Sequence, residues 1–120
     1  VHFVGSLPYG KYLKLLQASD VHVYLTRPFV LSWSMLEAMS CGCVVVASDT
    51  EPVREVIKEG VNGFLTDFFN PEQIAHKVLA VLSYPSFVKE ISINARNTIV
   101  NRFSLQKLLP AHLKLILSYV

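Results

Sequence analysis

Short apolar runs and helical apolar repeats alternate along this chain. Runs of β-branched and aromatic residues indicate strands, whereas apolar residues three or four positions apart indicate helices with one buried face. The pattern predicts strands at residues 1–4, 21–25, 43–47 and 64–66. It predicts helices at residues 9–18, 32–41, 52–58, 70–82, 86–101 and 104–119, the last one kinked or split at Pro110.

The order of these elements indicates the fold class. Residues 43–47 are apolar at every position, as in a strand that is buried on both faces. Strands that alternate with helices of about ten residues form βαβ units and a parallel sheet. We therefore predict an α/β fold with a Rossmann-like, mainly parallel sheet of about four strands and flanking helices.

The segment 30–48, VLSWSMLEAMSCGCVVVAS, carries the strongest functional signal. It starts a helix after Ser32, ends that helix at Gly42 and continues into the fully apolar strand. In open α/β sheets, ligands bind at the carboxyl ends of the strands, where helix N-termini present unpaired amides to anionic groups. The segment thus indicates a site for a diphosphate-linked ligand such as a nucleotide sugar.

Composition and charge limit the alternatives. The chain has room for one domain, residues 1–120, and its 52% hydrophobic content with 17% charge excludes a disordered chain. No apolar run approaches the roughly 20 residues of a membrane span. Residues 71–120 carry a net charge of +4, against −2 for residues 1–70. Because the basic residues are dispersed, we expect a solvated helical face, no nucleic-acid binding and at most weak attraction to anionic lipid headgroups.

Two cysteines and the start of the chain add further expectations. Cys41 and Cys43 have no further cysteine or nearby histidine, so they lack the ligand count of a zinc site. We expect two reduced, buried thiols in a cytoplasmic protein, peripheral at the inner membrane face if the lipid attraction suffices. The chain opens directly on an apolar run without a signal-peptide pattern, and we expect it to be part of a longer protein.

An ordered set of motifs connects the chain to a known family. The motifs are VHFVG, a helix ending in ASD, VHVYLTRPFVLSWSMLEAMSCGCVVVASD, VREVIKEGVNGFLTD and NPEQIAHKV. This order resembles the C-terminal donor-binding domain of retaining GT-B glycosyltransferases of the glycosyl transferases group 1, family four type. The resemblance implies that the domain binds a nucleotide-diphosphate sugar without a metal or other cofactor. It also implies that an N-terminal domain, absent from these residues, binds a glycan or lipid-linked acceptor.

Glu37 lies at the second of two glutamates that the family's pattern separates by seven residues. The resemblance implies that this carboxylate accepts hydrogen bonds from the donor's ribose hydroxyls, because its two oxygens can face a diol. The residues alone also allow a capping box, in which Ser34 starts the helix and Glu37 binds a backbone amide there. The resemblance favours the ribose role.

The first glutamate of that pattern falls on Phe29, and the family's Gly-Phe-Gly is replaced by Val30, Leu31 and Ser32. In the family this glutamate touches the donor sugar, whereas phenylalanine cannot accept a hydrogen bond. We interpret the chain as a divergent active enzyme. Its donor-binding loop then runs from Val30 to Trp33, where backbone amides can point at phosphate or sugar oxygens.

Weaker candidates flank this loop. Four residues match the family's loop beside the nucleotide base, although a tight turn and a helix cap explain them equally well: Gly5, Ser6, Leu7 and Tyr9. Arg27 can reach a phosphate, although an exposed loop arginine is more often only solvated. The side chains of Trp33 and Met39 have the spacing of core residues on the central helix.

Three functions stay open at this point. The first is the donor-binding part of an active glycosyltransferase, and the second, indicated by Phe29, is a nucleotide-binding pseudo-glycosyltransferase or regulatory module without turnover. The third is a doubly wound signalling domain of the receiver type. Such a domain needs an acidic cluster at the strand ends for magnesium, and only Asp49 is well placed, so we disfavour it.

The family's strand order bears on the behaviour of these residues alone. The resemblance implies the order three, two, one, four, five, six, with this chain starting at the third strand and two central strands missing. We therefore expect the 120 residues to bind donor poorly and to transfer no sugar. Residues 1–4 would pair with strand 21–25 by an unusual crossover, pair with another copy of the chain or stay loosely attached, and we favour self-association.

Overall fold

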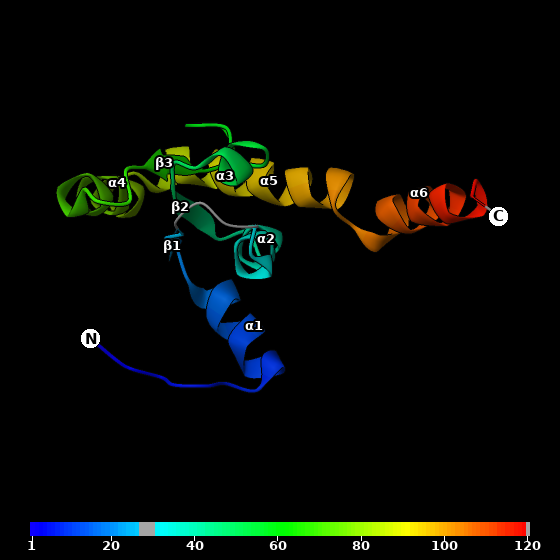
Figure 1. Cartoon of the computed structure of the whole chain (residues 1–120). Helices are drawn as coiled ribbons and strands as arrows, with labels where there is room; N and C mark the ends of the chain where they lie inside the picture. Colours follow the sequence, from blue (N-terminus) through cyan, green and yellow to red (C-terminus); the bar gives the residue numbers. More distant parts are fainter. Residues whose placement is uncertain (27–30, 120) are drawn as a thin grey trace.

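The computed structural model describes residues 1–26 and 31–119, and its elements follow the predicted order (Figure 1). The strands in this part of the chain are β1 (Val21–Tyr24), β2 (Val44–Ser48) and β3 (Phe64–Thr66). The helices are α1 (Tyr9–Ala18), α2 (Trp33–Ser40), α3 (Glu51–Arg54), α4 (Pro71–Ser83), α5 (Pro85–Arg102) and α6 (Leu105–Leu117).

The strands form a parallel sheet in the order β1-β2-β3, which confirms the predicted fold class. Val46 of β2 lies opposite Val23 of β1 and Phe64 of β3. Its neighbours Val45 and Ala47 point into a core formed with α1, α2, α3 and part of α5. Val46 itself packs on the other face, against α4 and the start of α5. Residues 44–47 of this strand are apolar because helices cover both of its faces.

Helix α2 ends where the sequence predicts. Gly42 has a φ of +81°, a left-handed conformation that glycine adopts without strain. The amides of Gly42 and Cys43 donate to the carbonyls of Met39 and Ala38, each at 3.0 Å. These two bonds form a Schellman motif, which satisfies the last carbonyls of the helix and turns the chain directly into β2.

Residues 1–4 do not form the predicted fourth strand. The segment is exposed, with Val1 at 110% and Phe3 at 97% relative exposure, and Figure 1 shows it extended before α1, apart from the sheet. A strand needs hydrogen-bonded neighbours, and its β-branched and aromatic composition does not replace them. In the single chain the segment is loosely attached, whereas self-association stays a prediction.

Helix α3 is shorter than the predicted 52–58. The Asn62 side chain bonds backbone groups of residues 56 and 58, which a longer helix would have used for its own hydrogen bonds. The buried amide of Asn62 accepts a hydrogen bond from the Lys58 amide at 2.7 Å and donates to the Val56 carbonyl at 3.0 Å. Asparagine side chains often replace helical backbone bonds in this way. The turn that these two Asn62 hydrogen bonds hold leads the chain into β3.

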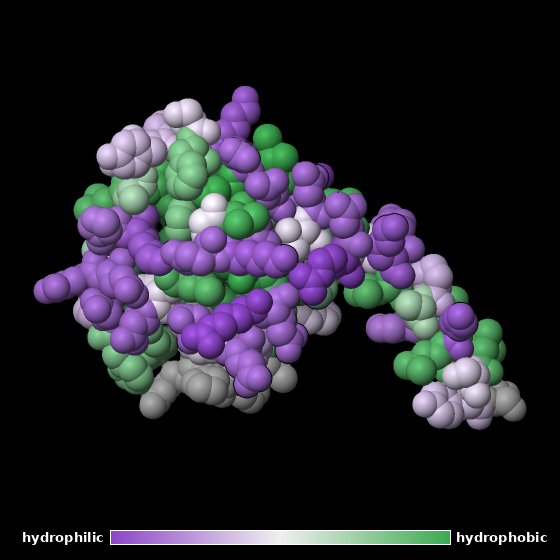
Figure 2. Space-filling view, turned by 90° about the horizontal axis from the view of Figure 1, so that it is seen from above, coloured by the Kyte–Doolittle hydropathy of each residue, from purple (hydrophilic) through white to green (hydrophobic). Residues whose placement is uncertain are grey.

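Helix α6 continues through Pro110, so the predicted split does not occur. None of its residues is buried, and it projects from the body with apolar side chains visible along it (Figures 1 and 2). Across the two described ranges, every helix is too short or too polar to cross a membrane.

The Asn62 hydrogen bonds predict a stability effect. This amide also donates to the Thr98 hydroxyl of α5 at 3.0 Å. We expect Asn62→Ala to lower the free energy of unfolding by about 1 to 3 kcal/mol, because buried partners lose their bonds. Asn97→Ala, on the exposed face of α5, is the matched control and should be nearly neutral. Denaturation of the full-length protein measures both, and equal stabilities would contradict the assigned role of Asn62.

The thiols predict a difference in reactivity. Burial raises the pKa of Cys43 to about 12 and also raises the pKa of the half-buried Cys41. Since only the thiolate reacts, we expect slow alkylation of Cys41 near neutral pH and alkylation of Cys43 only after unfolding. Mass spectrometry of iodoacetamide-treated protein with and without denaturant tests this, and rapid labelling of native Cys43 would refute it.

Candidate functional site

The start of α2 lies at the carboxyl edge of the parallel sheet, beside the ends of the strands. The Ser32 hydroxyl accepts a hydrogen bond from the Ser34 amide at 3.3 Å, so Ser32 is the N-cap of α2. The Ser32 amide in turn donates to the hydroxyl of Tyr24, a buried residue at the end of β1, at 3.2 Å. The start of α2 is thus capped by the Ser32 side chain and tied to the sheet by the Tyr24 hydroxyl.

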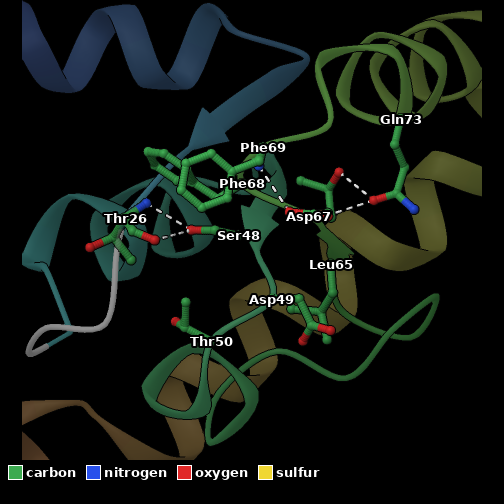
Figure 3. Close-up of a pocket in the computed structure, with 10 residues that line it drawn as sticks. Thr26, Ser48, Asp49, Thr50, Leu65, Asp67, Phe68, Phe69 and Gln73 are labelled. Atoms are coloured by element: carbon green, nitrogen blue, oxygen red, sulfur yellow. Dashed lines mark hydrogen bonds between the residues drawn. The ribbon is translucent and has the colours of Figure 1, made fainter.

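A second pair of hydrogen bonds joins the ends of β1 and β2. The buried Ser48 hydroxyl accepts from the Thr26 amide at 2.7 Å and donates to the Thr26 carbonyl at 2.8 Å (Figure 3). Thr26 immediately precedes residues 27–30, on which three candidates fall. Arg27, Phe29 and Val30 therefore lie outside the described residues, and their contacts stay predictions.

Glu37 and Tyr9 meet between α2 and α1. The Tyr9 hydroxyl donates to Glu37 Oε1 at 3.0 Å. This hydrogen bond raises the pKa of Tyr9, so the phenol stays protonated and can donate through the neutral pH range. The alternative capping box is wrong: the N-cap of α2 is Ser32 rather than Ser34, and the Glu37 carboxylate accepts a hydrogen bond from Tyr9 of α1.

The other candidates before α1 lie on the segment that leads to Tyr9. Gly5 has a left-handed φ of +60°, and the chain bends next to it at Ser6. Gly5 and Ser6 are exposed and Leu7 is half-buried. Of these candidates, the structure brings Tyr9 into contact with Glu37.

The loop residues Leu31, Ser32 and Trp33 differ in what they can offer a ligand. The Ser32 amide already donates to Tyr24, so it is not a free donor in this conformation. The Trp33 amide heads α2, where backbone donors lack helical partners. The three predicted amides therefore differ in whether they can donate a hydrogen bond to a ligand.

The expected core position of Trp33 is wrong, whereas that of Met39 is confirmed. Trp33 is 80% exposed and Met39 is fully buried. Trp33 is the first residue of α2 and lies outside the part of the helix that packs on β2 and α5. Its indole instead lines an apolar groove of about 670 Å³, together with Phe103, which follows α5, and Leu108 of α6.

Another cavity, which the sequence did not single out, opens at the carboxyl ends of β2 and β3. Its volume is about 620 Å³, within the range of small-molecule sites. It is lined by Thr26, Ser48, Asp49, Thr50, Leu65, Thr66, Asp67, Phe68, Phe69 and Gln73 (Figure 3). Polar residues directly after each strand were the available signal, but their convergence depends on the parallel register.

Arg54 fixes the carboxylate at the edge of this cavity. Its guanidinium donates to both oxygens of Asp49, at 2.5 and 2.8 Å. These hydrogen bonds hold the pKa of Asp49 below its usual value. Asp49 is therefore an ionised, paired carboxylate rather than a free metal ligand or proton donor.

The chain is similar to glycosyltransferases of known sequence. The chain is 32% identical over 108 residues to an uncharacterized glycosyltransferase, MJ1069, of Methanocaldococcus jannaschii, a match that covers 89% of this chain and 28% of that protein. It is 29% identical over 104 residues to alpha-maltose-1-phosphate synthase of Mycolicibacterium smegmatis, covering 82% and 27%. The chain thus spans less than a third of the length of these relatives.

Solved structures share the fold. The chain superposes on Alr3699/HepE of Anabaena, solved in complex with UDP, with a TM-score of 0.81 at 27% identity, covering 89% of this chain and 29% of that one. It superposes on sucrose-phosphate synthase of Thermosynechococcus elongatus with a TM-score of 0.88 at 22% identity, covering 99% and 30%, a likeness of fold. The family described as Glycosyl transferases group 1 matches residues 1–98, which hold the sheet, Glu37 and the cavity. This chain therefore belongs to the glycosyl transferases group 1 family.

Proposed function

We propose that these residues are the donor-binding part of a glycosyltransferase that moves a sugar from a nucleotide-diphosphate sugar to a glycan or lipid-linked acceptor, with retention. The observation that carries the proposal is the Glu37–Tyr9 contact beside the start of α2, in a chain of this family. Structures of Alr3699/HepE hold UDP or UDP-glucose, which supports a nucleotide sugar as the donor class.

In the proposed complex, Glu37 accepts hydrogen bonds from the ribose hydroxyls. A half-buried carboxylate suits this role because it offers two acceptor oxygens to a diol while its position is held by α2. Tyr9 Oη already supplies one such bond to Oε1, which supports Glu37 as an acceptor for a ligand hydroxyl. Ribose binding would replace or share this bond.

The diphosphate would lie at the N-terminus of α2. There the Trp33 amide and the helix dipole favour an anion, although a helix N-terminus alone contributes only about 0.3 to 2 kcal/mol. Tight binding therefore needs basic groups from the rest of the protein. The proposal includes no metal or other cofactor, as the family resemblance implies.

A second candidate function is a pseudo-glycosyltransferase that binds a nucleotide without turnover. Phe29 favours it, because this residue stands where the family's pattern has a glutamate. Both functions share the Glu37 site and differ in product formation by the full-length protein.

The ribose role predicts a loss of affinity. In the full-length protein we expect Glu37→Ala to weaken binding of the nucleoside diphosphate by about tenfold to several-hundredfold, because charge-assisted hydrogen bonds are lost. Tyr9→Phe, which keeps the ring, should have a smaller effect. Glu90→Ala on the exposed face of α5 is the control for charge. Calorimetric titration with uridine, guanosine and adenosine diphosphates measures all three, and normal affinity in Glu37→Ala would rule out the role.

Phe29 predicts opposite outcomes for the two functions. If the protein is a divergent active enzyme, Phe29→Glu should lower turnover, because Pro28, Val30 and Leu31 make an apolar sequence setting that penalises a carboxylate. Product formation by wild type and variant, followed by mass spectrometry, decides between them. Higher activity in Phe29→Glu would identify a decayed member of the family.

A further inference from the structure

The cavity at the ends of β2 and β3 differs chemically from the start of α2. Its lining contains two carboxylates, Asp49 and Asp67, and no lysine or arginine within the described part of the chain. Asp49 is paired with Arg54, so Asp67 gives the cavity its remaining negative charge. Such a lining disfavours phosphate and other anions and is compatible with a neutral ligand.

Two aromatic rings form one wall. Phe68 and Phe69 meet edge to face, with centroids 4.9 Å apart and planes at 75° (Figure 3). Phe69 is 71% exposed, although a phenylalanine gains by burying its ring. Its backbone is held in place, since the Phe69 amide donates to Asp67 Oδ1 at 2.9 Å. A phenylalanine ring that lines a cavity from a held backbone is suited to packing against an apolar ligand face.

The remaining wall contains polar groups that can form hydrogen bonds with a ligand. Gln73 Oε1 accepts from the Thr66 hydroxyl at 2.9 Å and the Asp67 amide at 2.7 Å, which fixes the side chain and leaves its amide nitrogen as a donor. The Thr50 hydroxyl is buried and has no hydrogen-bond partner within residues 1–26 and 31–119. An unpaired buried hydroxyl is costly, and rotation about its Cα–Cβ bond would offer it to a ligand in the cavity.

We propose that this cavity is a subsite for a neutral pyranose ring. The C–H face of the ring packs on Phe69, and its hydroxyls bond Asp67 and Thr50. The proposal rests on the proposed function: Thr26 lines the cavity, Ser32 caps α2, and only residues 27–31 separate them in the sequence. A ring bound here therefore lies at the same sheet edge as the diphosphate, and it belongs to the donor or to the acceptor glycan.

Saturation-transfer NMR on the full-length protein tests this, with methyl α-glycosides of glucose, galactose, mannose and N-acetylglucosamine as probes. We expect at least one glycoside to bind, Phe69→Ala to weaken it about two- to tenfold, and Phe69→Tyr to retain it. Thr50→Val, nearly equal in shape, should also weaken binding. Phe87→Ala removes another exposed phenylalanine, outside the cavity, and should leave binding unchanged.

Competition identifies the source of the ring. Displacement of the glycoside by a nucleotide sugar, but not by the nucleoside diphosphate, assigns the subsite to the donor. Binding of the glycoside alongside the nucleotide sugar assigns it to the acceptor. Displacement by inorganic phosphate would overturn the neutral character of the site.

The subsite and the proposed function fail differently. Two results overturn the subsite alone. The first is an unchanged glycoside affinity in Phe69→Ala and Thr50→Val. The second is that no glycoside binds, although a nucleoside diphosphate binds in a way that depends on Glu37. If neither a nucleoside diphosphate nor a nucleotide sugar binds, the proposed function is overturned as well.

Discussion

Strand β2 is buried at every position and is hydrogen-bonded to β1 on one side and β3 on the other. The positions of the start of α2 and of the cavity depend on this strand. Its valines pack alternately into the two cores, and each buried valine contributes about 1.5 to 3 kcal/mol relative to an exposed one. Because β1 and β3 both run parallel to β2, all three carboxyl ends lie at one edge. The start of α2 and the cavity share this edge for that reason.

Polar side chains at this edge hold the segments that leave the sheet. Ser48 bonds both backbone groups of Thr26, and the Tyr24 hydroxyl accepts from the Ser32 amide. The described ends of the loop before α2 are thus fixed to β1 and β2. Glu37 lies one turn further along α2, so its position is set by the same hydrogen bonds, and it contacts Tyr9 of α1. Rigid elements of this kind suit a site in which a carboxylate must meet a diol.

The sequence predicted the parts of the structure that depend on local pattern. The apolar run in β2, the N-cap at Ser32 and the stop at Gly42 were all found where expected, because burial, capping and left-handed turns have specific residue signatures. Residues 1–4 were predicted wrongly because pairing depends on neighbours that composition does not specify. Trp33 was misplaced because helical spacing alone does not show where packing begins.

The cavity was missed for a related reason. Thr50, Asp67 and Gln73 come from three separate segments, and only the parallel register brings them to one place. The family resemblance identified Glu37 but left its capping-box alternative open. The Tyr9 contact argues against that alternative, because Glu37 meets Tyr9 rather than a backbone amide of its own helix. The sequence could not predict this contact, because it depends on the relative position of α1 and α2.

The most direct test of the account is a double-mutant cycle between the protein and the ribose. Calorimetry would compare a nucleoside diphosphate with its 2′-deoxy and 3′-deoxy analogues, on wild type and on Glu37→Gln in the full-length protein. If Glu37 binds the ribose, loss of a ribose hydroxyl weakens binding about tenfold in wild type and much less in the variant. Equal losses in both proteins would contradict a ribose contact at Glu37.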